Sequence, residues 1–227
     1  MISEDAEKDI SSEQLEDHTE KIKQEYESHL LMSDPNSPEA AHWKGKDKTW
    51  LRFKILTEID NLNNKKVLDF GCGNALLMDF LNERGIKCEY HGWDISERMI
   101  EVAKKRHPKA KFKVINIFHE DLSEYVNFFD YILISGVFYI KVDGEESVHK
   151  KWIEQILLKL WNLSKKGLAV NFMTEYVDWR DSSLYYCPIN EIIIFCVDNL
   201  SRWFVIRHDY QLWEFTVYIY KEPKVKL

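Results

Sequence analysis

Short apolar runs alternate with segments of helical periodicity along most of this 227-residue chain. The apolar runs predict strands at 66–70, 88–93, 112–115, 131–135 and 168–172, and the periodic segments predict helices at 48–60, 75–84, 96–106, 147–163 and 189–199. Strands that alternate with helices indicate a parallel sheet with right-handed crossovers. Two last strands, 203–206 and 215–220, lie too close for a crossover helix and predict an antiparallel hairpin. The pattern therefore predicts an α/β fold with a seven-stranded, mostly parallel sheet and helices on both faces.

The first 32 residues differ from the rest of the chain because they are charged and mostly polar. An irregular apolar stripe (Leu15, Ile22, Tyr26, Leu30, Leu31) favours a helix from about Ser12, with Ser12 as its N-cap, over a partly disordered arm. A breaker cluster at 33–38 predicts a hinge. We expect residues 1–42 to form an acidic helical arm or lid and residues 43–227 to form the main domain.

Charge is concentrated in that arm. The first thirty residues hold ten acids and three lysines, a net of −7, and the whole chain is also −7, so residues 31–227 balance to zero. A neutral domain with an acidic arm lacks the basic patch that holds a phosphate backbone, so nucleic acid is not expected as a partner. The four cysteines and eight histidines show no zinc spacing, and no metal is expected. No signal peptide and no membrane-length apolar run is evident, which predicts a cytoplasmic protein without membrane contact.

The candidate chemistry lies around the first predicted strand. Val67-Leu68-Asp69-Phe70-Gly71-Cys72-Gly73-Asn74-Ala75 ends a strand in alternating glycines, and a second acid, Asp94, ends the next strand. This is the layout of a nucleoside-binding βαβ unit, in which glycines permit close backbone approach and Asp94 accepts hydrogen bonds from a ribose. A dinucleotide fingerprint would need a third glycine where Leu76 stands, and Asp69 would repel a pyrophosphate, so a nicotinamide oxidoreductase is disfavoured.

At these residues the chain resembles the class I S-adenosylmethionine-dependent methyltransferases, whose motif reads approximately [V/L]LD-x-G-C-G-x-G. The departure is Ala75 in place of the last glycine, and we expect the smallest replacement to be tolerated. The resemblance covers about residues 43–140 and implies a Rossmann-like sheet, S-adenosylmethionine as cofactor and S-adenosylhomocysteine as product.

The resemblance also implies roles for individual residues. Asp69, Gly71, Cys72 and Gly73 would cradle the methionine part, and Asp94 would hold the ribose hydroxyls. Ile95 and Met99 would flank the adenine, near Asn116 and Ile117 at the end of the third strand. Ser135 and Gly136 would lie where the methyl group emerges, and Trp43 and Arg52 would lie near the cofactor carboxylate. For Asn116, Trp43 and Arg52, plain turn, packing and surface roles are alternatives.

For the acceptor, an aromatic loop after the fifth strand (residues 173–186) and the segment 207–210 predict an aromatic-walled pocket. His208 is a candidate general base and Tyr139 a second candidate catalytic residue. The [D/N/S]-P-P-[Y/F/W] motif of amide and nucleobase methyltransferases is absent. The predicted function is methyl transfer to an oxygen or nitrogen of a small molecule by a monomer or homodimer. The alternatives are a protein methyltransferase docked through the acidic arm and a non-catalytic cofactor-binding module.

Overall fold

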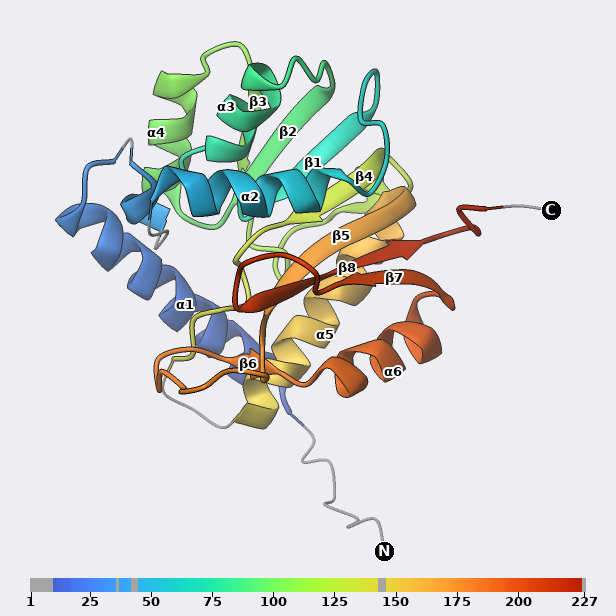
Figure 1. Ribbon diagram of the computed structural model, residues 1–227. Coiled ribbons are helices and arrows are strands. Elements are labelled where there is room, and N and C mark those ends of the chain that lie inside the picture. The colour runs from blue at the N-terminus through green and yellow to red at the C-terminus, as the bar shows by residue number, and fades with distance from the viewer. Residues whose placement is uncertain (1–9, 36, 42–44, 143–145, 226–227) are drawn as a thin grey trace, which may run out of the picture.

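The computed structural model describes residues 10–35, 37–41, 45–142 and 146–225. Its helices are α1 (Ser12–Met32), η1 (Pro38–Ala41), α2 (Lys46–Thr57), α3 (Leu76–Glu83), α4 (Glu97–Arg106), η2 (Ser123–Tyr125), α5 (Glu146–Leu163) and α6 (Ile189–Asn199). Its strands are β1 (Lys66–Phe70), β2 (Glu89–Asp94), β3 (Lys111–Val114), β4 (Phe129–Ile134), β5 (Ser164–Thr174), β6 (Tyr186–Cys187), β7 (Trp203–Arg207) and β8 (Glu214–Tyr220). Figure 1 shows the strands in one twisted sheet, with the helices packed against it.

The sheet has the order β3-β2-β1-β4-β5-β8-β7, with β6 paired beside the end of β5. The first five strands are parallel, β8 is antiparallel to β5, and β7 is antiparallel to β8. The predicted mostly parallel sheet with a C-terminal hairpin is therefore confirmed. The eighth strand is β6, a two-residue pairing of Tyr186 and Cys187 with Met173 and Thr174.

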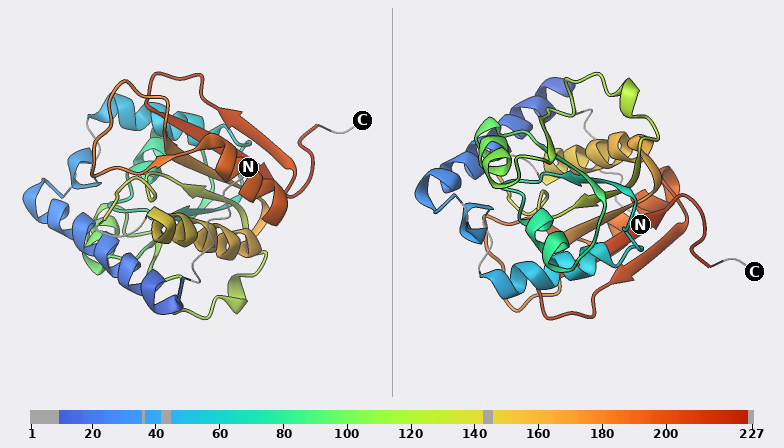
Figure 2. Two further views of the ribbon diagram at one scale, coloured as in Figure 1. Left: turned by 90° about the horizontal axis from the view of Figure 1, so that it is seen from below. Right: turned by 90° about the horizontal axis from the view of Figure 1, so that it is seen from above.

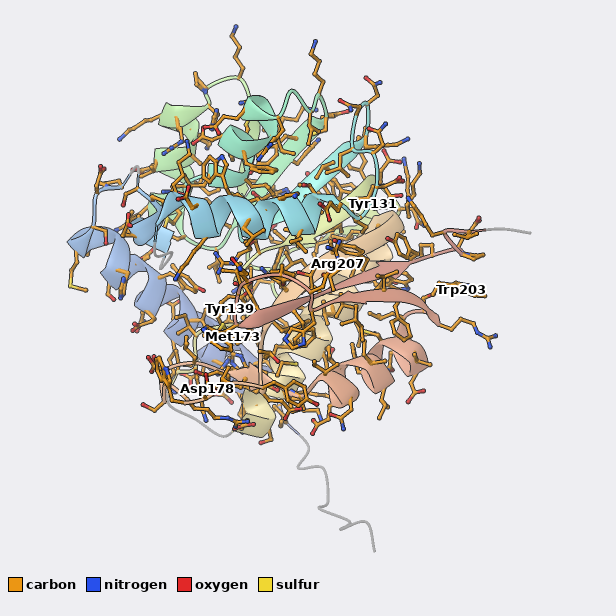
Figure 3. All side chains as sticks on the ribbon, viewed as in Figure 1. Tyr131, Tyr139, Met173, Asp178, Trp203 and Arg207 are labelled. Atoms are coloured by element: carbon orange, nitrogen blue, oxygen red, sulfur yellow. The ribbon has the colours of Figure 1, made fainter. Side chains whose placement is uncertain are left out.

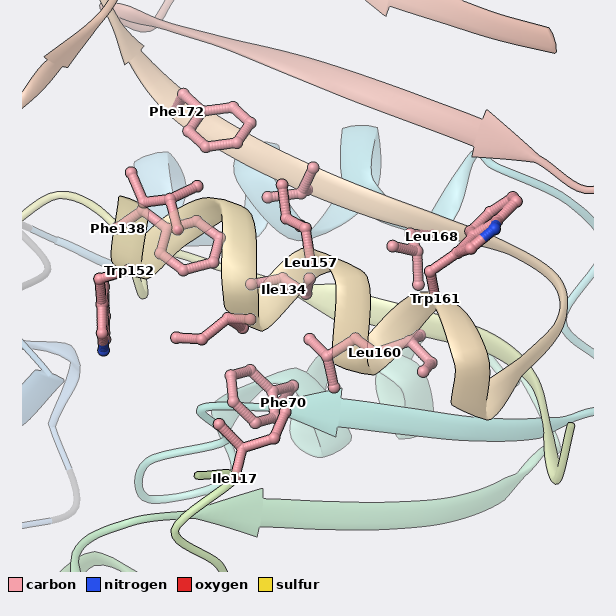
Figure 4. Close-up of a cluster of buried hydrophobic side chains, with 14 of the residues drawn as sticks. Phe70, Ile117, Ile134, Phe138, Trp152, Leu157, Leu160, Trp161, Leu168 and Phe172 are labelled. Carbon is pink, nitrogen blue, oxygen red and sulfur yellow. The ribbon is translucent and has the colours of Figure 1, made fainter. Parts of the chain in front are cut away.

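Alternate residues of the central strands pack against different helices. Ile132 and Ile134 of β4 belong to the core beneath α5, whereas Tyr131 and Leu133 belong to the core beneath α2 and α3. Figure 2 shows α2 and α5 on opposite sides of the sheet, as a strand buried on both faces requires. Figure 4 shows the core beneath α5, where Phe138, Leu157, Leu160 and Phe172 gather.

The acidic arm forms a full helix over residues 12–32 and packs beside α5 and α4. Its N-cap is Ser11, one residue before the predicted Ser12. The Ser11 hydroxyl accepts the Gln14 amide, and the Gln14 side chain accepts the Ser11 amide. This reciprocal capping box satisfies two backbone donors, which the Ser12 start would leave to water. Leu15, Ile22 and Leu30 of the predicted stripe are buried, and Leu31 is exposed.

Candidate functional site

A cavity of about 110 Å³, here called the inner pocket, lies at the carboxyl ends of β1, β2 and β4. Open parallel sheets bind ligands at this edge, beside the point where the strand order reverses. The pocket is lined by ten of the residues predicted from the sequence: Asp69, Gly71, Cys72, Gly73, Asp94, Ile95, Met99, Ile117, Ser135 and Gly136.

The loop after β1 is held in a conformation that favours glycine. Gly71 has φ +72°, and a Cβ there would lie 2.3 Å from Cγ2 of Val137. The amides of Gly71 and Cys72 both donate to the carbonyl oxygen of Trp93, at 2.8 and 3.0 Å. Ala75 also takes a left-handed conformation, with φ +62°, which costs an alanine about 1 kcal/mol. The motif geometry is thus kept at the position where alanine replaces glycine.

Two carboxyl groups face the inner pocket. Asp69 is 2% exposed and accepts a hydrogen bond from the Tyr90 hydroxyl at 2.6 Å. Burial, helped by the charge of Asp94, raises the pKa of Asp69 to about 7 although the Tyr90 bond opposes this. Asp94 accepts the amides of Gly73 and Ser96, at 2.8 and 2.9 Å, and burial also raises its pKa. A cationic ligand group beside Asp69 would restore its charged form.

Two further polar side chains, Ser135 and Asn116, lie just after the ends of β4 and β3. The Ser135 hydroxyl is buried and has no hydrogen-bond partner among the described residues, although it lines the inner pocket. A buried hydroxyl without a partner is costly and suits a ligand that supplies one. The Asn116 side chain instead accepts the amide of Phe118 at 3.0 Å and does not line the inner pocket. Its geometry is that of a turn residue.

Helix α1 covers the inner pocket, which Thr19, Ile22 and Tyr26 also line. The Tyr26 hydroxyl donates to the carbonyl oxygen of Gly136 at 2.8 Å. The carboxylate of Glu27 accepts the Ser96 hydroxyl at 2.7 Å. The predicted lid is thus bonded directly to the loop after β4 and to the N-cap of α4.

A second group of contacts ties α1 to α5. His18 Nε2 lies 2.9 Å from His149 Nδ1, and the Trp152 indole donates to the Thr19 hydroxyl at 2.8 Å. Desolvation lowers the pKa of His18 to about 4 and that of His149 to about 3, so both rings are neutral at pH 7. The Asn74 amide also donates to the carbonyls of Pro35 and Ser37, which follow α1 in the sequence.

A larger cavity of about 920 Å³, here called the outer pocket, adjoins the inner one and shares Tyr26 and Gly136 with it. A buried polar cluster forms part of its wall. Arg52 Nε donates to both carboxylate oxygens of Glu214 at 2.9 Å, and Tyr139 donates to the same carboxylate. The Asn171 side chain donates to Glu214 at 3.0 Å and accepts the Gly136 amide at 2.8 Å. The cluster therefore reaches the peptide between the two pockets.

These contacts place the remaining predicted residues. Arg52 and Tyr139 line the outer pocket and not the inner one. Burial and the charge of Glu214 raise the pKa of Tyr139, so its hydroxyl keeps its proton. His208 lines neither pocket; its ring is exposed and lies 6.2 Å from that of Tyr176. Trp43 falls outside the described residues.

Sequence reasoning missed Asn171 and Glu214. The available signal was a polar residue next to apolar ones: Asn171 lies within the predicted strand 168–172, and Glu214 directly precedes the predicted strand 215–220. A polar group that is buried in such a strand needs a partner. Among the described residues, no group of histidine, cysteine or acidic side chains has the arrangement of a metal site. No helix in the described part of the chain is long and apolar enough to cross a membrane.

The sequence matches a family described as a methyltransferase domain over residues 61–198. It is 32% identical over 157 residues to the Mycobacterium tuberculosis protein named "Putative methyltransferase Rv1506c", which covers 67% of this chain and 91% of the relative.

Among solved structures, the S-adenosylmethionine complex of magnesium protoporphyrin IX methyltransferase from Synechocystis superposes with a TM-score of 0.60 at 15% identity, over 95% of this chain and 100% of that one. Phosphoethanolamine N-methyltransferase 1 from Haemonchus contortus superposes with a TM-score of 0.62 at 11% identity, over 92% of this chain and 50% of that one. At these identities the superpositions show a shared fold.

Proposed function

We propose that this chain, which belongs to the S-adenosylmethionine-dependent methyltransferases, methylates an oxygen or nitrogen atom of a small molecule. One observation carries this proposal. An inner pocket with a buried acid adjoins a larger outer pocket, and Tyr26 and the Gly136 peptide line both of them. A cofactor in the first and an acceptor in the second would meet beside that peptide.

The inner pocket fits the cofactor. The turn at Gly71 leaves no room for a Cβ, and the Asp69 carboxyl, whose pKa is raised to about 7, would gain from a cationic neighbour. Asp69 would hold the ammonium of the methionine part, Asp94 would accept the ribose hydroxyls, and the apolar side chains of Ile95, Met99 and Ile117 would enclose the adenine.

The bound cofactor supplies an electrophilic methyl group and leaves as S-adenosylhomocysteine. The protein's own part is orientation and exclusion of water. Helix α1 covers the inner pocket with Ile22 and Tyr26, and holding the reactants in line supplies much of the rate acceleration. The Tyr139 hydroxyl keeps its proton and donates a hydrogen bond to Glu214, so Tyr139 orients neighbouring groups and does not act as a base. The exposed position of His208 gives no support to a general-base role for it.

Calorimetric titration with S-adenosylmethionine, S-adenosylhomocysteine and NAD in parallel tests the cofactor part. We expect micromolar binding of the first two and none of NAD. Asp94→Ala should weaken binding by about 1–3 kcal/mol, because two ribose hydroxyls lose their partner. Unchanged binding by this variant would refute the placement of the ribose.

A radiolabelled methyl-transfer screen tests the acceptor part. It compares alcohols, amines and carboxylates with a mixture of proteins as acceptors. Label transferred to low-molecular-weight compounds supports the proposal. Label found only on protein would show that the alternative, a protein methyltransferase, is correct. Cofactor binding with no transfer to any acceptor would favour a non-catalytic module.

A further inference from the structure

We propose that the outer pocket recognises a carbohydrate, so that the acceptor is a hydroxyl group on a sugar ring. This inference rests on the proposed function, in which the outer pocket holds the acceptor. It depends on three features of that pocket: the hydrogen-bonding character of its wall, the balance of its charges, and an exposed tryptophan on its lining.

Most side chains that line the outer pocket can form hydrogen bonds, and they come from distant parts of the chain. Helix α1 contributes Gln24 and Ser28, the loop before β6 contributes Ser183, and the loop before β8 contributes Gln211. Amide and hydroxyl groups both donate and accept, as the hydroxyl groups of a sugar do. The side chains of Gln24, Ser28 and Ser183 already donate within the protein, to Glu20, Glu25 and Asp181 respectively. Their oxygen atoms can still accept hydrogen bonds from the hydroxyl groups of a ligand.

The charges of the outer pocket are of both signs and partly paired. Lys21 lies 2.7 Å from Asp17, Lys141 lies 3.4 Å from Glu146, and Arg52 is bound by Glu214. The lining also includes Lys48 and the acids Glu25 and Asp181, so four basic side chains (Lys21, Lys48, Arg52, Lys141) face three acidic ones (Glu25, Asp181, Glu214). A phosphate or carboxylate acceptor calls for a cluster of cationic groups, and a polyamine calls for a cluster of acids. A neutral molecule with many hydroxyl groups agrees best with this mixture.

Trp213 adds an apolar surface to this polar wall. It lines the outer pocket, although 60% of its surface is exposed. Its carbonyl accepts the amide of Thr174, which places Trp213 beside the end of β5. The exposed Tyr176 follows Thr174 by two residues. The face of an aromatic ring carries negative charge and attracts polarised C–H groups, which one face of a sugar ring presents. Figure 3 shows Met173 and Tyr139 on this side of the molecule, and Trp203 at the opposite edge.

Saturation-transfer difference NMR tests the inference on the full chain with saturating S-adenosylhomocysteine. The probes are the methyl glycosides of glucose, galactose and mannose, with catechol, glycerol 3-phosphate and spermidine as comparators. We expect transfer to the ring protons of at least one glycoside. Trp213→Ala should reduce that signal at least fivefold. Trp203→Ala, which removes a tryptophan that is 43% exposed on the edge strand β7, should leave it unchanged.

The possible failures can be told apart. If S-adenosylhomocysteine binds and no glycoside receives transfer, or if one of the comparators receives it instead, the carbohydrate inference is wrong and the proposed function stands. Equal loss of signal in Trp213→Ala and Trp203→Ala would also overturn it, because the contact would then not be specific to the outer pocket. Failure of S-adenosylhomocysteine itself to bind would overturn the proposed function and this inference with it.

Discussion

Lowering the pH from 7.5 to 5.5 should weaken the docking of helix α1 on the domain. The cause is the pair formed by His18 and His149, which are both buried at the contact between α1 and α5. His149 Nε2 lies 3.3 Å from the carbonyl of Phe138, so it carries the proton and Nδ1 accepts from His18. A proton added to Nδ1 of His149 would set two donors against each other.

The size of the effect follows from the pKa shifts. The pKa of each ring is lowered, from an ordinary 6.5 to about 4 for His18 and about 3 for His149, so the docked helix binds fewer protons than the released one. The stability from docking is therefore complete above pH 6.5 and declines as the pH falls below it. At pH 5.5 each ring costs about 1.4 kcal/mol, and the pair costs up to about 3 kcal/mol, an approximately 100-fold change in the docking equilibrium.

Other charged groups around the pair modify this effect without reversing it. Lys21 and Lys141 act with desolvation to lower the pKa values of His18 and His149 respectively, whereas Asp17 raises that of His18. The Tyr185 ring, 4.6 Å from that of His149, keeps its proton because burial raises its pKa.

Hydrogen-exchange mass spectrometry, corrected for the intrinsic pH dependence of exchange, measures the release. The protection of amides in α1 should fall up to about 100-fold between pH 7.5 and 5.5, while protection in β5 stays constant. The double variant His18→Gln/His149→Gln, whose amides do not titrate, is the control and should show little change. An equal fall in the double variant, or no fall in the natural protein, would refute the reasoning.

Three further predictions concern the two pockets. Affinity for S-adenosylmethionine, measured by calorimetry, should rise as the pH increases through about 7, because the buried Asp69 then ionises. Asp69→Asn should abolish that rise, and a rise that persists in this variant would exclude Asp69 as its source. Gly71→Ala should bind S-adenosylhomocysteine much more weakly, because a Cβ at this position would collide with Val137. Gly85 also has a positive φ, +67°, but no atom lies near its Cβ position, so Gly85→Ala should lose only about 1–2 kcal/mol of stability and keep its affinity; equal affinities of the two variants would argue against a steric cause. Glu214→Gln should lower the free energy of unfolding, measured in urea, by about 3–5 kcal/mol, because the buried Arg52 loses the negative charge that faces it. The control Glu58→Gln removes a surface ion pair and should cost less than about 1 kcal/mol; an equally small loss in Glu214→Gln would contradict the prediction.

The sequence predicted the sheet because strand, helix and turn signals are local. The Ile-Leu-Ile run of β4 indicated a strand buried on both faces, and the glycines after β1 indicated a ligand loop at its end. Two local details were missed. Strand β6 has only two residues and produces no periodic pattern. The N-cap of α1 was predicted at Ser12, one residue after Ser11, which forms the capping box with Gln14.

The outer pocket was less predictable because its contacts are not local. Arg52 and Glu214 are 162 positions apart, and only the antiparallel pairing of β8 with β5 brings the glutamate to the arginine on α2. From its position in the sequence, Arg52 was predicted to lie near the cofactor carboxylate, with a surface role as the alternative. The structure places it in the wall of the outer pocket, buried against Glu214. His208 directly follows β7, the outermost strand, so its position near the end of the sheet did not bring it to either pocket.

Helix α1 contributes to both cavities, with Thr19 and Ile22 on the inner one and Gln24 and Ser28 on the outer one. It lies outside the stretch 61–198 that carries the family resemblance. Part of the wall of each cavity is thus encoded outside the segment that matches the family. Under the proposed function, exchanging residues 12–32 between relatives would change one side of the acceptor pocket and leave the nucleoside-binding motif intact. A shortened protein that lacks this helix would lose a wall of each cavity.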